Sequence, residues 1–180
     1  ARIKDSTCPG VLAAVLGGEE GQPFVPMRGL IGSDIMKARP DYAVIDNPFA
    51  PGDPIAVLPA IRPDFALVHA DLVDRFGNVW VGGRHEIKSM AHAARQTLVT
   101  AEDITDHDLR LDPTRSANLV GELYVTAIAK AEGGAWPTAV PGKYAADEAA
   151  LAAYAVASRS DEGFAAWLAD HVGGTRVAAE

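Results

Sequence analysis

The sequence predicts an α/β fold in which helices flank an open, mostly parallel sheet. The run "FALVHA" (residues 65–70) is apolar almost throughout, as in strands that are covered on both faces. Residues 85–96 place apolar side chains at helical spacing, and "TLVTAEDI" (residues 97–104) returns to a strand pattern. A strand, a helix and a second strand in succession are typical of parallel pairing.

Composition limits the class of protein. The chain has 180 residues, of which 48% are apolar, so we expect one soluble α/β domain over residues 1–180. The formal net charge of -8, with Lys and Arg scattered among more numerous acids, argues against a nucleic-acid partner. The single cysteine, Cys8, fits a reducing cytoplasm, and no apolar run is long enough to predict a membrane span.

The segments before residue 65 alternate short elements with breakers. Residues 9–18 predict a helix with proline in its first turn and a glycine pair at its end. Residues 19–40 hold too many glycines and prolines for one regular element, and residues 41–49 and 54–61 read as two extended segments joined by a turn.

The segments after residue 74 continue the pattern. A Gly77-Asn78 turn precedes a short strand at residues 78–81, and residues 122–131 alternate well enough for a strand. Residues 132–145 form a second breaker-rich loop. Residues 147–158 and 161–172 predict two helices, each opened by acidic residues that suit a helix N-terminus.

Familiar chemical motifs are absent. The sequence has no phosphate loop, no dinucleotide fingerprint, no Gly-x-Ser-x-Gly elbow and no His-Glu-x-x-His pair. His85, Glu86 and His92 are wrongly spaced for ligands on one helix face, which favours a solvated helix over a metal site. We therefore assign no catalytic residue and no metal ligand within the chain.

Arg28 is the strongest candidate for binding. It is a fixed cation in a loop of glycines and prolines, where a guanidinium can hold a carboxylate through two parallel hydrogen bonds. The alternative is a surface arginine paired with Asp34 or with a helix end.

Two further candidates follow buried strands. His69 lies near the end of its strand, where open α/β sheets line their ligand crevice, and Glu102 is positioned as a buried carboxylate near the same crevice. The alternatives are a histidine bound to a neighbouring backbone group, and a glutamate that satisfies backbone amides or begins a helix. Asp74 is expected to cap the turn at Gly77 and Asn78.

Four segments resemble the α subunit of family I CoA-transferases, especially the glutaconate CoA-transferase-like branch. They are "QPFVPMRGLIGSD", "DNPFAPGDPIAVLPAIRPDFALVHADLVDRFGNVWVGG", "AARQTLVTAEDI" and the "AEGGAWPT" to "KYAADE" region. The resemblance runs in order over residues 22–154. It implies the open α/β fold of that family.

The resemblance also implies an activity. In that family an α and a β subunit form the active site together, and a β-subunit glutamate forms covalent acyl and CoA intermediates while CoA moves from an acyl-CoA to a carboxylic acid. It therefore implies a hetero-oligomer with a β subunit, and CoA as substrate with no other cofactor. Two alternatives stay open: a hydrolase of CoA thioesters or CoA-linked rings on the same scaffold, and a non-catalytic CoA-ester-binding domain. The apolar residues beside Arg28, which are Phe24, Val25 and Met27, would allow a bulky acyl group.

Some family features are missing. The glycine-rich "GGF"-type loop of α subunits and the Ser-Glu-Asn-Gly type of segment of β subunits do not occur, and the sequence lacks an initiating methionine. We therefore expect the carboxyl-terminal portion of a longer α subunit, with an apolar surface where the rest of the protein or the β subunit docks.

The resemblance assigns roles to only a few residues. Arg28 matches an arginine in the loop that faces the shared active site, which implies contact with the acyl carboxylate or a carbonyl of the substrate. Gly29, Gly32 and Ser33 would shape that loop and offer hydrogen bonds. With His69 and Glu102, these residues form the predicted substrate-binding set.

Overall fold

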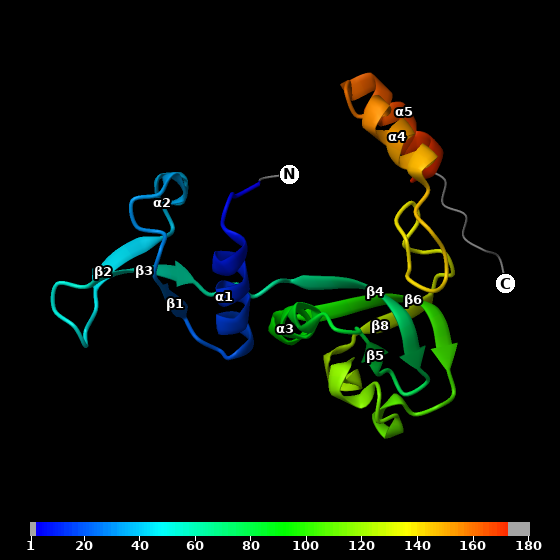
Figure 1. Cartoon of the computed structure of the whole chain (residues 1–180), viewed down its shortest axis with the longest axis horizontal. Coiled ribbons are helices and arrows are strands. Elements are labelled where there is room, and N and C mark those ends of the chain that lie inside the picture. Colours follow the sequence, from blue (N-terminus) through cyan, green and yellow to red (C-terminus); the bar gives the residue numbers. More distant parts are fainter. Residues whose placement is uncertain (1–2, 173–180) are drawn as a thin grey trace. The chain divides into compact units, whose positions relative to one another are not determined.

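The computed structural model describes residues 3–172, and the chain divides into two compact units, Ala1–Glu132 and Gly133–Glu180 (Figure 1). The first unit contains a three-stranded and a five-stranded sheet, and the second contains two helices. That residues 1–180 form a single domain stays a prediction.

The first helix, α1, spans Cys8–Glu19. The side chain of Thr7 caps it by accepting a hydrogen bond from the Gly10 amide at 3.2 Å. The helix ends one residue beyond the predicted glycine pair, and those glycines also allow close packing. A Cβ atom on Gly18 would lie 1.9 Å from the carbonyl oxygen of Ile61, so only glycine fits at this contact.

A three-stranded antiparallel sheet has the order β1-β3-β2. Its strands are β1 (Phe24–Met27), β2 (Ala43–Asp46) and β3 (Pro54–Pro59), and a short helix, α2 (Asp34–Ala38), follows β1. The breaker-rich segment at residues 19–40 thus holds two regular elements that were not predicted. One face of the sheet joins a core of six buried residues: Ala14, Val25, Leu30, Tyr42, Ala56 and Leu58.

The five-stranded sheet contains the predicted parallel pair. Its order is β7-β5-β4-β6-β8, with β4, β6 and β8 parallel and the short β5 and β7 antiparallel to their neighbours. The strands are β4 (Phe65–Asp74), β5 (Val79–Trp80), β6 (Gln96–Thr105), β7 (Leu119–Val120) and β8 (Ala127–Lys130). Helix α3 (His85–Ala93) lies between β5 and β6 in the sequence.

Burial on β4 differs from the prediction. Ala66, Val68 and Ala70 are buried, and the last two join the core that includes residues of α3, whereas Phe65 and Leu67 on the other face are 55% and 71% exposed. The apolar run therefore does not mean burial on both faces within this unit. One face of the parallel strands stays open.

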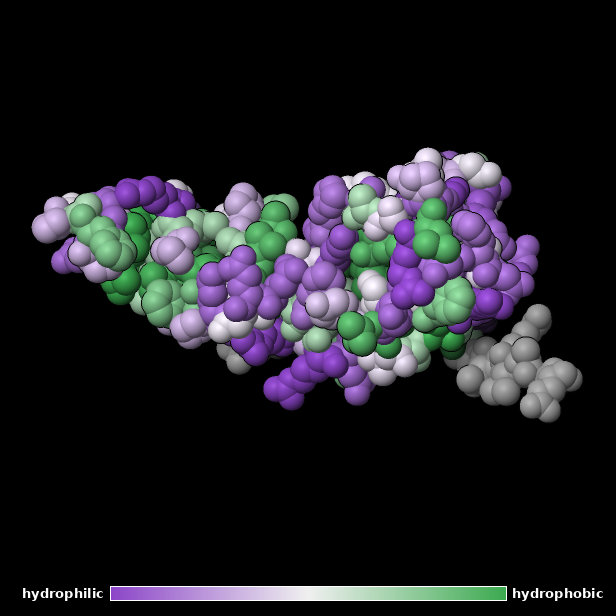
Figure 2. Space-filling view, turned by 90° about the horizontal axis from the view of Figure 1, so that it is seen from below, coloured by the Kyte–Doolittle hydropathy of each residue, from purple (hydrophilic) through white to green (hydrophobic). Residues whose placement is uncertain are grey.

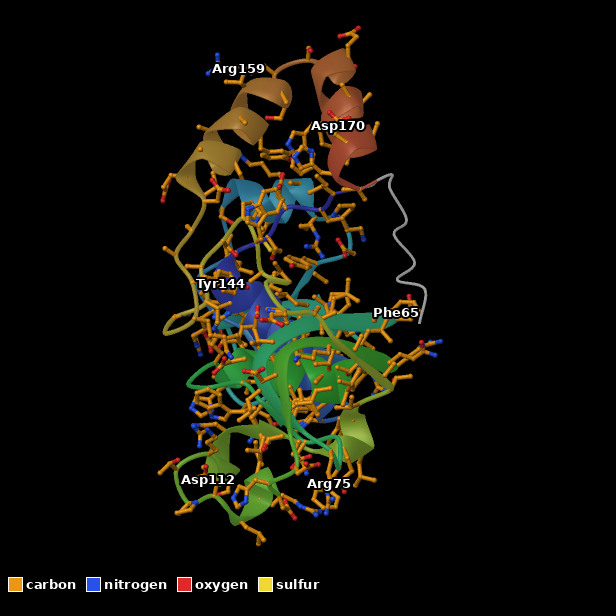
Figure 3. All side chains as sticks on the ribbon, turned by 90° about the vertical axis from the view of Figure 1, so that its right-hand side faces the viewer. Phe65, Arg75, Asp112, Tyr144, Arg159 and Asp170 are labelled. Carbon is orange, nitrogen blue, oxygen red and sulfur yellow. The ribbon has the colours of Figure 1, made fainter. Side chains whose placement is uncertain are left out.

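The end of β4 is fixed by one buried carboxylate. Figure 3 labels Phe65, where this strand begins, and Arg75, which directly follows it. Asp74 is 1% exposed and accepts hydrogen bonds from the backbone amides of Phe76, Asn78 and Leu109 and from the Asn78 side chain. The predicted turn cap is confirmed.

Three single-turn 3₁₀ helices lie after β6. They are η1 (Leu109–Leu111), η2 (Ser116–Asn118) and η3 (Glu122–Tyr124). The strand predicted at residues 122–131 is correct only in its second half, which forms β8. The first half becomes η3.

The described part of the second unit, residues 133–172, consists of a turn-rich segment and a helical hairpin. The helices are α4 (Glu148–Ala157) and α5 (Asp161–His171), and the side chains of Asp147 and Ser160 cap them. The rings of Tyr154 and Trp167 join the two helices edge to face at 4.8 Å between centroids. In the part of the chain that the structure describes, no helix is both long and apolar enough to cross a membrane.

Candidate functional site

The predicted substrate-binding residues lie in two places. Arg28, Gly29, Gly32 and Ser33 lie in the loop between β1 and α2, beside the three-stranded sheet. His69 and Glu102 lie on neighbouring strands of the five-stranded sheet.

Arg28 holds a carboxylate, although not the one considered from the sequence. Its Nη1 and Nη2 atoms donate to Oδ1 and Oδ2 of Asp53 at 2.6 and 2.5 Å, in a two-pronged ion pair. Asp53 immediately precedes β3, which pairs with β1, so the sheet brings the two side chains together. The alternative partner, Asp34, bonds Lys37 instead.

The ion pair stays charged at neutral pH. Hydrogen bonds from Arg28 and then from Asn47 lower the pKa of the Asp53 carboxyl to about 2, and the same contact raises the pKa of Arg28. The Asn47 Nδ2 atom donates to Asp53 Oδ2 at 2.8 Å. The Arg28 side chain is still 69% exposed, so other molecules can reach its guanidinium.

The loop after Arg28 owes its shape to two glycines and a serine. Gly29 and Gly32 have φ of 88° and 82°, which side-chain-bearing residues rarely adopt. The Ser33 hydroxyl donates to the carbonyl oxygen of Leu30 at 2.6 Å, and the buried Leu30 side chain anchors the loop in the core. Ser33 thus supports the loop in this structure.

A groove of about 480 Å³ lies beside Arg28 on the face of the three-stranded sheet that points away from the core. The residues that line it are Phe24, Pro26, Met27, Arg28, Ile45, Asn47, Pro48, Phe49, Ile55 and Val57. On the left of Figure 2, where this sheet lies, apolar side chains gather at the surface. Phe24 and Met27 were expected to adjoin a substrate and do line the groove, but Val25 lies in the core.

His69 and Glu102 contact each other directly. His69 Nε2 lies 2.7 Å from Glu102 Oε1, and His69 Nδ1 lies 2.8 Å from the Thr100 hydroxyl. Glu102 is 2% exposed, so the expectation of a buried carboxylate is confirmed, whereas the alternative that it begins a helix is wrong. Both ring nitrogens of His69 face side chains and not the neighbouring backbone.

Sequence reasoning missed Asp53 and Asn47. Both lie in the turn between β2 and β3, where Asn and Asp are ordinary turn residues. Only the pairing of β1 with β3 reveals their role, and the sequence offers no signal for that pairing. Among residues 3–172, no group of three side chains is arranged to hold a metal ion.

Comparison with known proteins identifies the fold and the family. No model of a known protein family matches the sequence. The chain is 32% identical over 162 residues to the A subunit of 3-oxoadipate CoA-transferase from Pseudomonas knackmussii, an alignment that covers 89% of this chain and 56% of that protein. It is 29% identical over 164 residues to the cholesterol ring-cleaving hydrolase IpdA subunit of Mycobacterium tuberculosis, covering 86% and 56%.

A solved structure gives the same result. The crystal structure of glutaconate coenzyme A-transferase from Acidaminococcus fermentans superposes with a TM-score of 0.84 at 29% identity, over 93% of this chain and 57% of that one. The architecture is therefore that of the CoA-transferase fold. The chain belongs to the α subunits of the family I CoA-transferases, as predicted, and it spans about half the length of the curated relatives it matches.

Proposed function

We propose that this chain serves as the α subunit of a two-subunit CoA-transferase that moves CoA from an acyl-CoA to a carboxylic acid. The observation that carries the proposal is the family relationship over most of the chain, together with a groove whose lining includes the Arg28 guanidinium. The names of two relatives specify 3-oxoadipate and glutaconate, which are both dicarboxylic acids. An arginine that can hold a carboxylate suits such substrates.

The catalytic carboxylate belongs, in this proposal, to a glutamate of the β subunit. That glutamate attacks the acyl-CoA carbonyl, the carbon–sulfur bond breaks, and an acyl-glutamyl anhydride and a CoA thiolate form. The thiolate then attacks the glutamyl carbonyl, which releases the first acid and leaves a glutamyl-CoA thioester. The acceptor carboxylate repeats the steps in reverse order.

The residues of this chain bind and orient the substrate in the proposal. Arg28 contacts a substrate carboxylate or carbonyl, and Gly29, Gly32 and Ser33 hold the loop in place. His69 and Glu102 form a second polar contact region on the parallel strands. We propose a hetero-oligomer in the cytoplasm, with CoA as substrate and no other cofactor.

Mass spectrometry of the assembled complex tests the function. The complex of this chain with its β subunit is incubated with acyl-CoA alone and then with an added acid acceptor. We expect a β-subunit peptide that carries CoA on a glutamate, and new acyl-CoA only when the acceptor is present. A complex that neither acquires the adduct nor transfers CoA contradicts the proposal.

The second candidate is a hydrolase on the same scaffold, and the relative named as a ring-cleaving hydrolase subunit favours it. It predicts that substrate is consumed without an acceptor, either with release of CoA or with the gain of one water by a CoA-linked ring. The third candidate, a non-catalytic domain that binds CoA esters, predicts that Arg28→Ala weakens ligand binding while there is no turnover to lose.

A further inference from the structure

We propose that the groove beside Arg28 binds an organic acid with a bulky apolar body, and that the carboxylate of this acid replaces Asp53 on the Arg28 guanidinium. The inference depends on the proposed function only in making that acid a substrate of CoA transfer. It adds the class of acid, and it proposes that Asp53 competes with the carboxylate of this acid for the Arg28 guanidinium.

The walls of the groove are formed by apolar side chains of the three-stranded sheet. Side chains along a strand point alternately to the two faces of a sheet, so Val25, Ala56 and Leu58 face the core while Ile55 and Val57 face the groove. A sheet with one face toward water normally carries polar side chains on that face. Here both faces are apolar, so the outer one is suited to contact with something other than water.

The size and composition of the groove suit a small molecule. Its volume of about 480 Å³ lies in the range of roughly 300–1,000 Å³ that is common for ligand pockets. Phe24 is 49% exposed and Ile45 is 40% exposed, so an apolar ligand would cover considerable apolar surface. Among the described residues that line the groove, Arg28 is the only charged one.

The charge of Arg28 explains why a carboxylate is expected in the groove. The Arg28 guanidinium presents two parallel donors, and Asp53 already shows that a carboxylate fits them. An ion pair at the protein surface contributes little net free energy, so one carboxylate exchanges readily for another. A single cation among apolar walls favours an acid with an apolar body over a short dicarboxylate, so the acid of this chain would differ from the two that the relatives' names specify.

Asn47 connects the Arg28–Asp53 pair to the wall of the groove. Its Nδ2 atom donates to Asp53, and its Oδ1 atom accepts from the amide of Phe49 at 3.0 Å. The Phe49 ring is 94% exposed and lines the groove. When Asp53 is displaced, Asn47 therefore loses a hydrogen-bond partner. Asn47 is itself hydrogen-bonded to the turn that carries the Phe49 ring.

The test measures binding to the purified full chain without a β subunit. The probe is 3-phenylpropionate, compared with 3-phenylpropan-1-ol, which lacks the charge, and glutarate, which lacks the apolar body. Affinities come from chemical-shift changes in ¹H–¹⁵N spectra, including the Arg28 Nε signal. We expect the wild-type chain to prefer 3-phenylpropionate to both comparison compounds.

Two variants distinguish specific binding at Arg28 from nonspecific binding to the protein surface. Asp53→Asn removes the competing charge, so we expect binding about two- to fivefold tighter, which is the scale of an exposed ion pair. Arg28→Gln removes the guanidinium, so we expect binding weaker by the same scale, about two- to fivefold. The matched control is Asp108→Asn, which removes the carboxylate of a similar two-pronged pair with Arg110 away from the groove and should leave affinity unchanged.

Several outcomes would overturn the inference. They are weaker or unchanged binding in Asp53→Asn, equal binding of the alcohol and the acid, and no binding of any probe, the last of which would favour a protein partner on this face. Because no turnover is measured, failure of CoA transfer leaves a positive binding result intact. Conversely, the complex could transfer CoA while the chain fails these binding tests. The proposed function would then stand, and the inference about the groove would be wrong.

Discussion

Replacement of Asp74 by asparagine should strongly destabilise the first unit. The two carboxylate oxygens accept four hydrogen bonds at 2.8–3.0 Å in a site where Asp74 is 1% exposed. Asparagine offers one acceptor oxygen, so two of the four bonds are lost and an NH₂ group faces two other donors. At roughly 1.5–3 kcal/mol for each bond to a charged acceptor, the expected loss is about 3–6 kcal/mol.

The assay combines global and local measurements. Urea unfolding followed by far-UV circular dichroism gives the free energy of unfolding, and hydrogen exchange reports the amide of Leu109, which donates to Asp74 Oδ2. We expect this amide to lose protection in Asp74→Asn. Asp106→Asn, at an exposed position on the same chain segment, should stay within about 0.5 kcal/mol of the wild type.

A small effect of Asp74→Asn would contradict this role of the carboxylate. If Asp74→Asn costs less than about 1 kcal/mol and the Leu109 amide keeps its protection, the carboxylate does not hold the turn through these bonds. A domain is stable by only about 5–15 kcal/mol, so the predicted loss is easily measured.

Three further changes test the packing and electrostatics. Gly18→Ala should cost about 2–4 kcal/mol in urea unfolding, because the new methyl group meets a backbone carbonyl oxygen, whereas Gly83→Ala, with open space around it, should be nearly neutral. Hydrogen bonds from the threonine two residues on, and then from a nearby arginine, hold the pKa of Asp112 at about 2, below its ordinary 3.8. Its contribution to stability is thus complete above pH 3.8 and disappears as pH falls through about 2, so the stability deficit of Asp112→Asn should shrink over that interval. His92→Phe keeps a ring in place but removes the 2.8 Å hydrogen bond to Glu19, which should cost about 1 kcal/mol and raise the pKa of the Glu19 carboxyl in NMR titration.

Local patterns were enough to predict the parallel core. The apolar run of β4, the helical spacing of α3 and the second run of β6 depend on short-range periodicity, which the sequence displays directly. The turn after β4 was also predictable, because Asp, Gly and Asn suit a tight turn for backbone reasons.

The rest depended on contacts between distant segments. Gly17 and Gly18 were read as a helix end, but they also allow close approaches that no local rule reveals, the first to Val25 of β1 and the second to the chain after β3. The Arg28–Asp53 pair joins residues 25 positions apart through strand pairing, so the sequence could nominate Arg28 but not its partner. For the same reason the apolar residues around Arg28 could not be divided in advance between core and groove.

The two-faced three-stranded sheet has an evolutionary consequence. Core and groove residues alternate along the same strands, so a substitution at Ile55 or Val57 changes the groove while its neighbours Ala56 and Leu58 keep the fold intact. Ligand preference and stability can therefore change independently, although the residues that determine them are neighbours in the sequence. Single substitutions in the groove could change which acid is bound during evolution while the core stays stable.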